Sequence, residues 1–501
     1  MDLLANLALG FDVALSPTNL FWCFFGAVVG TAVGVLPGLG PIGTIALLLP
    51  VTFGLDPVAA LVMLAGIYYG SQYGGSTTAI LINLPGESSS LVTTLDGHAM
   101  AKDGRAGAAL ASAAIGSFFA GTVATLLIAV LAPPLTAVAL SFGPPEYFSL
   151  MILGLTLAIS LARGSVVKAI GMTLVGILLG LIGRDIYTAL PRFTFGTVQL
   201  VDGLSFVTIA VGIFAVGELL RQLTDPAGGQ PIVQRHNRLL LTREEIRQIV
   251  APILRGTGIG SILGLLPGGG AVLSSFVSYS VERGVAKDPS QFGKGAIAGV
   301  AGPEAANNAG AQTSFIPMLT LGIPSNPVMA LMIGALILQG ITPGPKVITS
   351  EPALFWGLIA SMWLGNLMLV VLNLPLVGLW VRLVSVPPAV LLPVILGIST
   401  IGVYSVGLST FDVLLMAGVG LFGYLLAKLD CEPAPMLLGF ILGPMLEEHL
   451  RRAMIVSRGE FSTFVTSPLS AALLALAVLS LVLALRPSNR RRRQEVFAED
   501  A

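Results

Sequence analysis

The sequence predicts an all-α polytopic membrane protein built from two inverted-topology repeats, each with a re-entrant hairpin and a broken helix. Its composition is 54% hydrophobic with a mean hydropathy of +0.90, and only 10% of residues are charged, against about 25% in soluble domains. Two nearly matching runs, GTAVGVLPGLG at 30–40 and GSILGLLPGGG at 260–270, each interrupt an apolar stretch. Matched breaks in two halves of a chain are typical of transporters.

Apolar stretches place about 10–12 membrane segments, plus the hairpins, along the chain, since a spanning helix needs roughly 20 apolar residues. The segments of the first repeat are expected at 20–54, 57–85, 107–131, 146–162, 165–183 and 203–222. Those of the second repeat are expected at 249–283, 295–324, 327–341, 353–381, 388–403, 410–428 and 433–446. The domains are a first repeat (1–222), a cytoplasmic linker (223–248), a second repeat (249–450) and a C-terminal extension with an extra membrane helix, 468–486, and a basic tail (451–501).

The distribution of basic residues between the repeats predicts that the second is inverted relative to the first. Lys102 and Arg105 follow the second apolar block of the first repeat, whereas the matching stretch at 324–327 carries no charge. Lysine and arginine prefer cytoplasmic loops. A loop that is basic in one repeat and uncharged in the other is therefore expected on opposite sides of the membrane in the two repeats. The linker and the C-terminus are then cytoplasmic. Five arginines fall on the other side and disagree with this assignment: Arg184, Arg192, Arg451, Arg452 and Arg458.

The two Pro-Gly breaks are candidate substrate-binding tips. Glycine lets a backbone approach a ligand closely, a helix N-terminus attracts anions, and carbonyls at half-helix C-termini suit sodium. The alternative is a kink that serves only packing. The residues assigned here to substrate binding are Pro37, Gly38, Gly40, Gly268, Gly269 and Gly270.

Neutral polar side chains cluster in the apolar block that follows each break. Hydroxyls and amides offer oxygen atoms to cations and donors to carboxylates, although they also commonly tie membrane helices together. The substrate-binding candidates are Ser76, Thr77, Thr78, Asn83, Thr313, Ser314, Ser325 and Asn326.

Glu304 is the most notable charge, because it lies within an otherwise uncharged apolar block. An acidic residue inside a membrane segment is by default a candidate functional residue. The alternative is that Glu304 lies at the membrane interface and is solvated. The candidate sodium ligands are Asn83, Glu304, Asn307 and Asn308.

Enzymatic and nucleic-acid-binding functions are disfavoured by the sequence. It contains no Ser-His-Asp constellation, no HExxH and no P-loop, the net charge is zero, and Cys23 and Cys431 have no metal-ligand spacing. We therefore expect no enzyme activity and no cofactor.

The motifs resemble the large membrane subunit of the bacterial tripartite tricarboxylate transporters over roughly residues 15–450. They are PGLGP within 34–50, GGSTTAILINLPGE at 74–87, DGH at 96–98, LLPGGG at 265–270, GPEAANNA at 302–309 and GIPSNP at 322–327. The resemblance implies a permease working with a small, roughly four-helix membrane subunit and a periplasmic solute-binding protein. It also implies sodium- or proton-coupled, elevator-like uptake of citrate-like tricarboxylates or dicarboxylates.

The expected function is thus a secondary active transporter subunit in the bacterial inner membrane, with a carboxylate and the lipid bilayer as its other partners. A passive channel and a stand-alone exporter of organic anions remain alternatives. A structural scaffold is a further alternative, which would not need matched Pro-Gly breaks.

Overall fold

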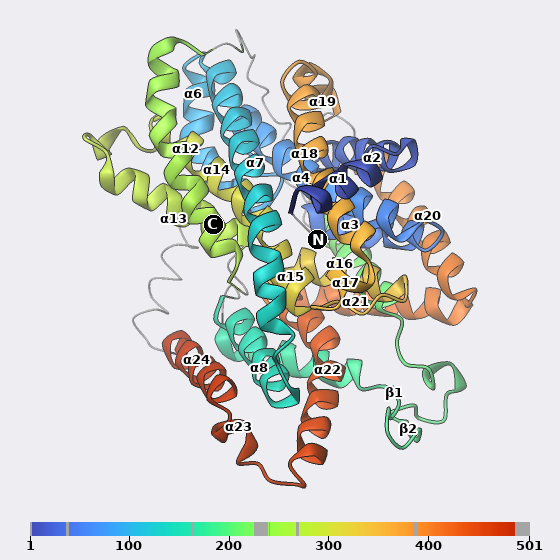
Figure 1. The fold of residues 1–501 in the computed structure, drawn as a ribbon. Coiled ribbons are helices and arrows are strands. Elements are labelled where there is room, and N and C mark those ends of the chain that lie inside the picture. The colour runs from blue at the N-terminus through green and yellow to red at the C-terminus, as the bar shows by residue number, and fades with distance from the viewer. Residues whose placement is uncertain are drawn as a thin grey trace.

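The computed structural model describes residues 3–36, 40–161, 165–224, 239, 241–266, 270–383 and 388–485. Almost all regular structure in these ranges is helical, and the strands β1 and β2 form one short antiparallel pair (Figure 1). Five described helices, α2, α7, α18, α21 and α24, are long and apolar enough to cross a membrane. The protein is therefore an all-α, multi-pass membrane protein.

The long helices of the first half agree with the predicted segments, and the structure adds α1, a group of short turns after α4 and the two strands. The elements of this half are α1 (Leu3–Ala14), α2 (Pro17–Val35), α3 (Gly40–Thr52), α4 (Pro57–Ile82), η1 (Ser88–Ser90), α5 (Leu91–Thr93), η2 (Thr94–His98), α6 (Ala99–Lys102), α7 (Ala106–Ala139), α8 (Pro144–Leu161), α9 (Val166–Gly180), β1 (Gly183–Arg184), β2 (Pro191–Arg192), η3 (Val198–Leu200), α10 (Phe206–Ala210), η4 (Val211–Val216) and α11 (Gly217–Thr224).

The second half also opens with a helix pair separated at a Pro-Gly break, and its described elements include no strand. Its elements are α12 (Arg243–Gly264), α13 (Gly270–Val285), η5 (Pro289–Gln291), α14 (Ala298–Thr313), α15 (Phe315–Leu321), α16 (Pro327–Leu338), α17 (Val347–Ser350), α18 (Pro352–Asn373), α19 (Val377–Leu383), α20 (Pro388–Gly407), α21 (Thr410–Lys428) and α22 (Ala434–Val456). The extension forms α23 (Thr463–Thr466) and α24 (Pro468–Leu485).

Helix starts follow local capping chemistry. The Ser16 side chain accepts a hydrogen bond from the Asn19 N–H at the start of α2, and Asp56 caps α4 in the same way. A proline occupies the first turn in both helices, where its missing N–H has no intrahelical partner to lose. Thr242 and Glu245 form a reciprocal capping box at the start of α12.

The same glycine packing occurs in both halves. A Cβ added at Gly30 would lie 2.3 Å from the Ile67 carbonyl oxygen, and one added at Gly260 would lie 2.3 Å from that of Ala306. Small residues four apart allow two helices to approach to backbone contact in a membrane. The full set pairs Gly26, Gly30 and Gly34 of α2 with Met63, Ile67 and Ser71 of α4, and Gly256, Gly260 and Gly264 of α12 with Gly302, Ala306 and Gly310 of α14.

This shared contact pattern supports the internal repeat, whereas the inversion of one copy relative to the other stays a prediction. α4 and the matching α14–α15 segment also end alike, on a residue with positive φ (Asn83 and Gly322) that is followed two positions later by proline.

The last helices of each half pack against helices of the other half. In the first half α9 packs against α22, and in the second half α21 packs against η4 and α11. A Cβ at Gly176 would lie 2.0 Å from the Met436 carbonyl oxygen, and one at Gly423 would lie 3.3 Å from the Ile213 Cα. α7 runs between the upper and lower groups of helices in Figure 1 and contacts α4, α12, α14, α15 and α18. The two halves therefore form one interlocked body.

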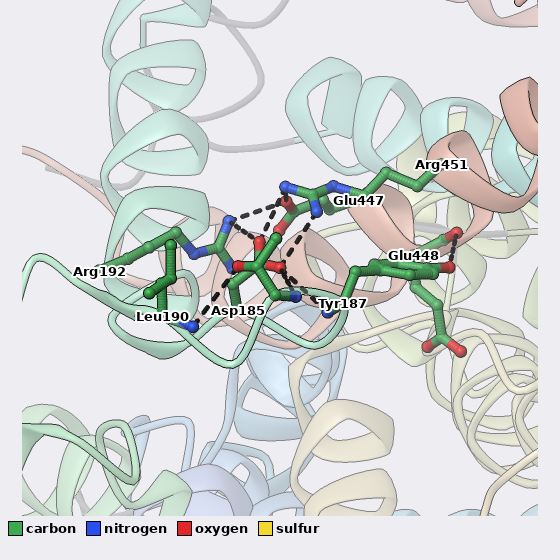
Figure 2. A network of polar contacts seen from close by, with 8 residues as sticks. Asp185, Tyr187, Leu190, Arg192, Glu447, Glu448 and Arg451 are labelled. Carbon is green, nitrogen blue, oxygen red and sulfur yellow. Dashed lines mark hydrogen bonds and ion pairs between the residues drawn. The ribbon is translucent and has the colours of Figure 1, made fainter.

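A network of ion pairs fixes the loop between α9 and α10 to the end of α22 (Figure 2). Asp185 pairs with Arg451 at 2.9 Å and with Arg192 at 3.4 Å, and Glu447 pairs with the same two arginines at 2.5 and 2.8 Å. The Arg451 guanidinium also lies 5.5 Å from the centre of the Tyr187 ring. Two of the arginines that disagreed with the charge rule therefore have a structural role, because they hold this loop in place.

Candidate functional site

Glu304 lies at the centre of a buried polar cluster that joins the two halves of the chain. It is carried by α14 and is only 1% exposed, so the interfacial, solvated reading of this residue is wrong. The Ser76 hydroxyl on α4 donates to Glu304 Oε2 at 2.7 Å, and the Thr93 hydroxyl donates to Oε1. None of the ion pairs among the described residues involves Glu304.

A second acid, Glu87, completes the cluster. Asn307, one turn along α14 from Glu304, donates from Nδ2 to Glu87 Oε1 at 3.3 Å. Ser89 donates to Glu87 and also contacts Gln72 Oε1 at 3.0 Å. Asn307 therefore links Glu87 to the helix turn that carries Glu304. The site thus gathers two carboxyl groups that are hydrogen-bonded by neutral donors.

The two asparagines on α14 have different environments. Asn308 is engaged in packing, because its Nδ2 donates to Ser117 Oγ on α7 at 2.6 Å and to the Glu304 carbonyl at 3.1 Å. Asn307 is fully buried, and its Oδ1 has no hydrogen-bond partner among the described residues. An unpaired buried oxygen is costly, so Asn307 is the better candidate for a ligand contact.

The start of each helix that follows a Pro-Gly break lies beside the broken segment of its own half. Gly40 begins α3 with φ +57° and has the Gly86 carbonyl 3.9 Å from its added Cβ. Gly270 begins α13 with φ +48° and has Asn326 Nδ2 at 3.3 Å from its added Cβ. The remaining predicted tip residues, Pro37, Gly38, Gly268 and Gly269, lie outside the described residues.

Several other predicted residues serve helix structure. Their hydroxyls bond to backbone carbonyls: Thr77 to Tyr73, Thr78 to Gly75, Thr313 to Ala309, Ser314 to Gly310 and Ser325 to Ser314. Asn326 caps α16 by accepting from the Met329 N–H. Asn83 is an exposed helix terminus with φ +59° and is absent from the hydrogen bonds that build the Glu304 cluster in the described part of the chain.

Residues outside the predicted set also build the site. Thr93 and Ser89 lie in turns without hydrophobic periodicity, so sequence reasoning did not place them near Glu304. Gln72 lies one turn before Ser76 on α4. Because residues four apart share a helix face, this spacing could have predicted Gln72 as part of the site. Asp96, of the DGH motif, accepts from the backbone N–H groups of Gly293, Gly295 and Ala296, and so anchors the approach to α14.

The fold and this buried carboxyl cluster define a multi-pass membrane protein with an internally repeated, charged core, which is the architecture of a transporter. A profile of the Tripartite tricarboxylate transporter TctA family matches residues 20–438, and the chain belongs to this family.

Two relatives come from Agrobacterium vitis. One, an "Uncharacterized 52.8 kDa protein in TAR-I ttuC' 3'region", is 62% identical over 500 residues, which cover 100% of both chains. The other, an "Uncharacterized protein in TAR-II ttuC' 3'region", is 63% identical over 241 residues, which are 48% of this chain and all of the relative. No solved structure matches the chain.

Proposed function

We propose that the chain is the permease subunit of a secondary active transporter that imports carboxylates by symport with sodium, or with protons. The observation that carries this proposal is Glu304, a buried acid of the second half that is held by neutral donors from the first half. A carboxylate in such a position is costly unless a cation or a proton neutralises it. Coupling to an ion gradient requires a group that binds and releases a cation or a proton, and Glu304 is suited to this role.

The starts of α3 and α13 are the proposed contacts for the substrate. Their first turns present free backbone N–H groups and the positive ends of helix dipoles, which favour carboxylate groups. Each start lies beside the broken segment of its own half, at Gly86 and at Asn326. Citrate-like tricarboxylates or dicarboxylates offer several anionic groups, which suits binding by two such helix ends.

Family membership supports the proposed assembly. A small membrane subunit would accompany the chain in the bacterial inner membrane, and a periplasmic solute-binding protein would deliver the carboxylate. Alternating access would be elevator-like, with the Glu304 cluster moving together with the helix pairs α2–α3 and α12–α13.

Uptake of labelled di- and tricarboxylates into vesicles containing this chain and its small subunit tests the proposal. Loaded binding protein is added outside, with and without an inward sodium or proton gradient. The proposal expects uptake that requires the binding protein and one of the gradients. Uptake that is indifferent to both would instead identify a channel or a stand-alone porter.

A further inference from the structure

A small cavity lies beside Glu304, between α4, α7, α14 and the end of α18. Its volume is about 10 Å³ for the centre of a water-sized sphere, which is room for about one water molecule or one dehydrated sodium ion. Its polar lining comes from Tyr73, Ser76, Thr77, Ser117, Glu304 and Asn373, and the remaining lining residues are apolar. No basic side chain contributes to this lining.

Asn373, the last residue of α18, lines this cavity and carries an unsatisfied oxygen. Its Nδ2 donates to the Leu369 carbonyl at 3.0 Å and lies 3.4 Å from Thr31 Oγ1. A carbonyl can only accept, so the nitrogen must face Leu369, and this fixes the orientation of the amide. The Asn373 Oδ1 is buried and has no hydrogen-bond partner in the described part of the chain. This free acceptor is the group that a cation would use.

The hydroxyls around the cavity can also act as ligands. Thr77 gives its proton to the Tyr73 carbonyl at 3.1 Å, which leaves lone pairs on its oxygen. Ser117 Oγ accepts from Asn308 Nδ2 at 2.6 Å and keeps one further lone pair. Together with the Glu304 carboxylate and Asn373 Oδ1, these hydroxyls make the polar part of the lining a group of oxygen atoms, which hard cations prefer.

The charge balance favours a cation over a water molecule. None of the ion pairs among the described residues involves Glu304, and Glu87, which accepts from Asn307 one turn further along α14, adds a second carboxyl group. A water molecule would satisfy Asn373 Oδ1 but would leave the charge of an ionised Glu304 uncompensated. A monovalent cation satisfies both the oxygen and the charge.

We propose that this cavity is the site of the coupling sodium ion, held by Glu304 and Asn373 Oδ1 with Thr77 and Ser117 as supporting oxygen ligands. The proposal rests on the proposed symport function and assigns its ion to a defined place. Because the ligands come from α4, α7, α14 and α18, an occupied site would tie the two halves of the chain together.

Binding of radioactive sodium to the full chain, co-expressed and purified with its small subunit, tests this site without any carboxylate or binding protein. We expect saturable binding by the wild-type protein. Asn373→Ala should weaken it by about tenfold or more, the loss that corresponds to one charge-assisted contact. Asn19→Ala is the matched control, since Asn19 is a buried asparagine whose side chain donates from Nδ2 to the nearby Val13 carbonyl.

Asn373→Asp separates a ligand role from a packing role. Aspartate keeps an oxygen at the cavity but loses the donor to Leu369, so it should retain sodium binding if the oxygen is a ligand. Equal loss in Asn373→Ala and Asn373→Asp, or wild-type binding in Asn373→Ala, would overturn the proposed site. Absence of saturable sodium binding in the wild-type protein would overturn it as well, and would favour a water molecule there.

Carboxylate uptake distinguishes failure of this site from failure of the proposed function. Sodium-dependent uptake with an unchanged sodium requirement in Asn373→Ala would place the ion elsewhere and leave the symport function standing. Uptake that needs neither sodium nor protons would remove the symport function itself.

Discussion

Replacing Gly30 by alanine tests the backbone packing on which both halves depend. The added Cβ would lie 2.3 Å from the Ile67 carbonyl oxygen, whereas an ordinary carbon–oxygen contact is about 3.3 Å or longer. α2 and α4 would therefore separate locally by about 1 Å. Overpacking of this kind costs about 1–3 kcal/mol, and the better helix propensity of alanine offsets about 1 kcal/mol of it.

Thermal unfolding of the purified protein in detergent measures this cost. Gly30→Ala and the equivalent Gly260→Ala should both lower the unfolding temperature. Gly171→Ala and Gly418→Ala are matched controls on exposed helix faces, where no atom lies within 4 Å of the added Cβ, and they should leave it unchanged or slightly raised. An unfolding temperature of Gly30→Ala equal to that of Gly171→Ala would refute the packing argument.

Three further outcomes are expected. Glu304→Gln should abolish or strongly weaken the sodium dependence of uptake while the unfolding temperature stays near the wild-type value; an unchanged sodium titration would contradict its role. Arg255→Met leaves the Glu282 side chain, 1% exposed, without its bidentate partner, and loss of one member of a buried pair costs up to about 3–5 kcal/mol. It should lower the unfolding temperature more than Arg452→Met, whose exposed ion pair is worth little; equal effects would show that burial of Glu282 is unimportant. The backbone N–H groups of the turn, and then the Arg451 guanidinium, hold the pKa of the Asp185 carboxyl well below its usual range. The ionised Asp185 therefore stabilises the folded protein above about pH 4, and this contribution is lost as the pH falls further. The difference in unfolding temperature between wild type and Asp185→Asn should therefore shrink below about pH 4, and a constant difference down to strongly acidic pH would count against this linkage.

The helices were predictable where hydropathy and Pro-Gly breaks set their limits. Segments expected at 20–54 and 249–283 are the helix pairs α2–α3 and α12–α13, which are interrupted at the predicted breaks. α22 was expected to end at 446 but continues to Val456, because charged pairs four residues apart, such as Glu447 with Arg451, support a helix beyond the apolar stretch. Hydropathy alone cannot detect that continuation.

The centre of the candidate site was predicted in part. Glu304 and Ser76 were identified as an unusual charge and a polar cluster, and the structure brings them together across the two halves. Glu87, Thr93 and Asn373 were not assigned to the site, because their proximity depends on packing between distant segments. The glycine spacing at 26, 30 and 34, repeated at 256, 260 and 264, was visible in the sequence and could have predicted the close helix pairs.

Simultaneous measurement of sodium and carboxylate fluxes in the same vesicles tests the central claim most directly. With binding protein outside and no initial carboxylate gradient, an inward sodium gradient should drive carboxylate accumulation together with sodium entry in the wild-type protein. Glu304→Gln should uncouple the two fluxes. Carboxylate that only equilibrates across the membrane, with no accompanying entry of sodium or protons, would contradict the account.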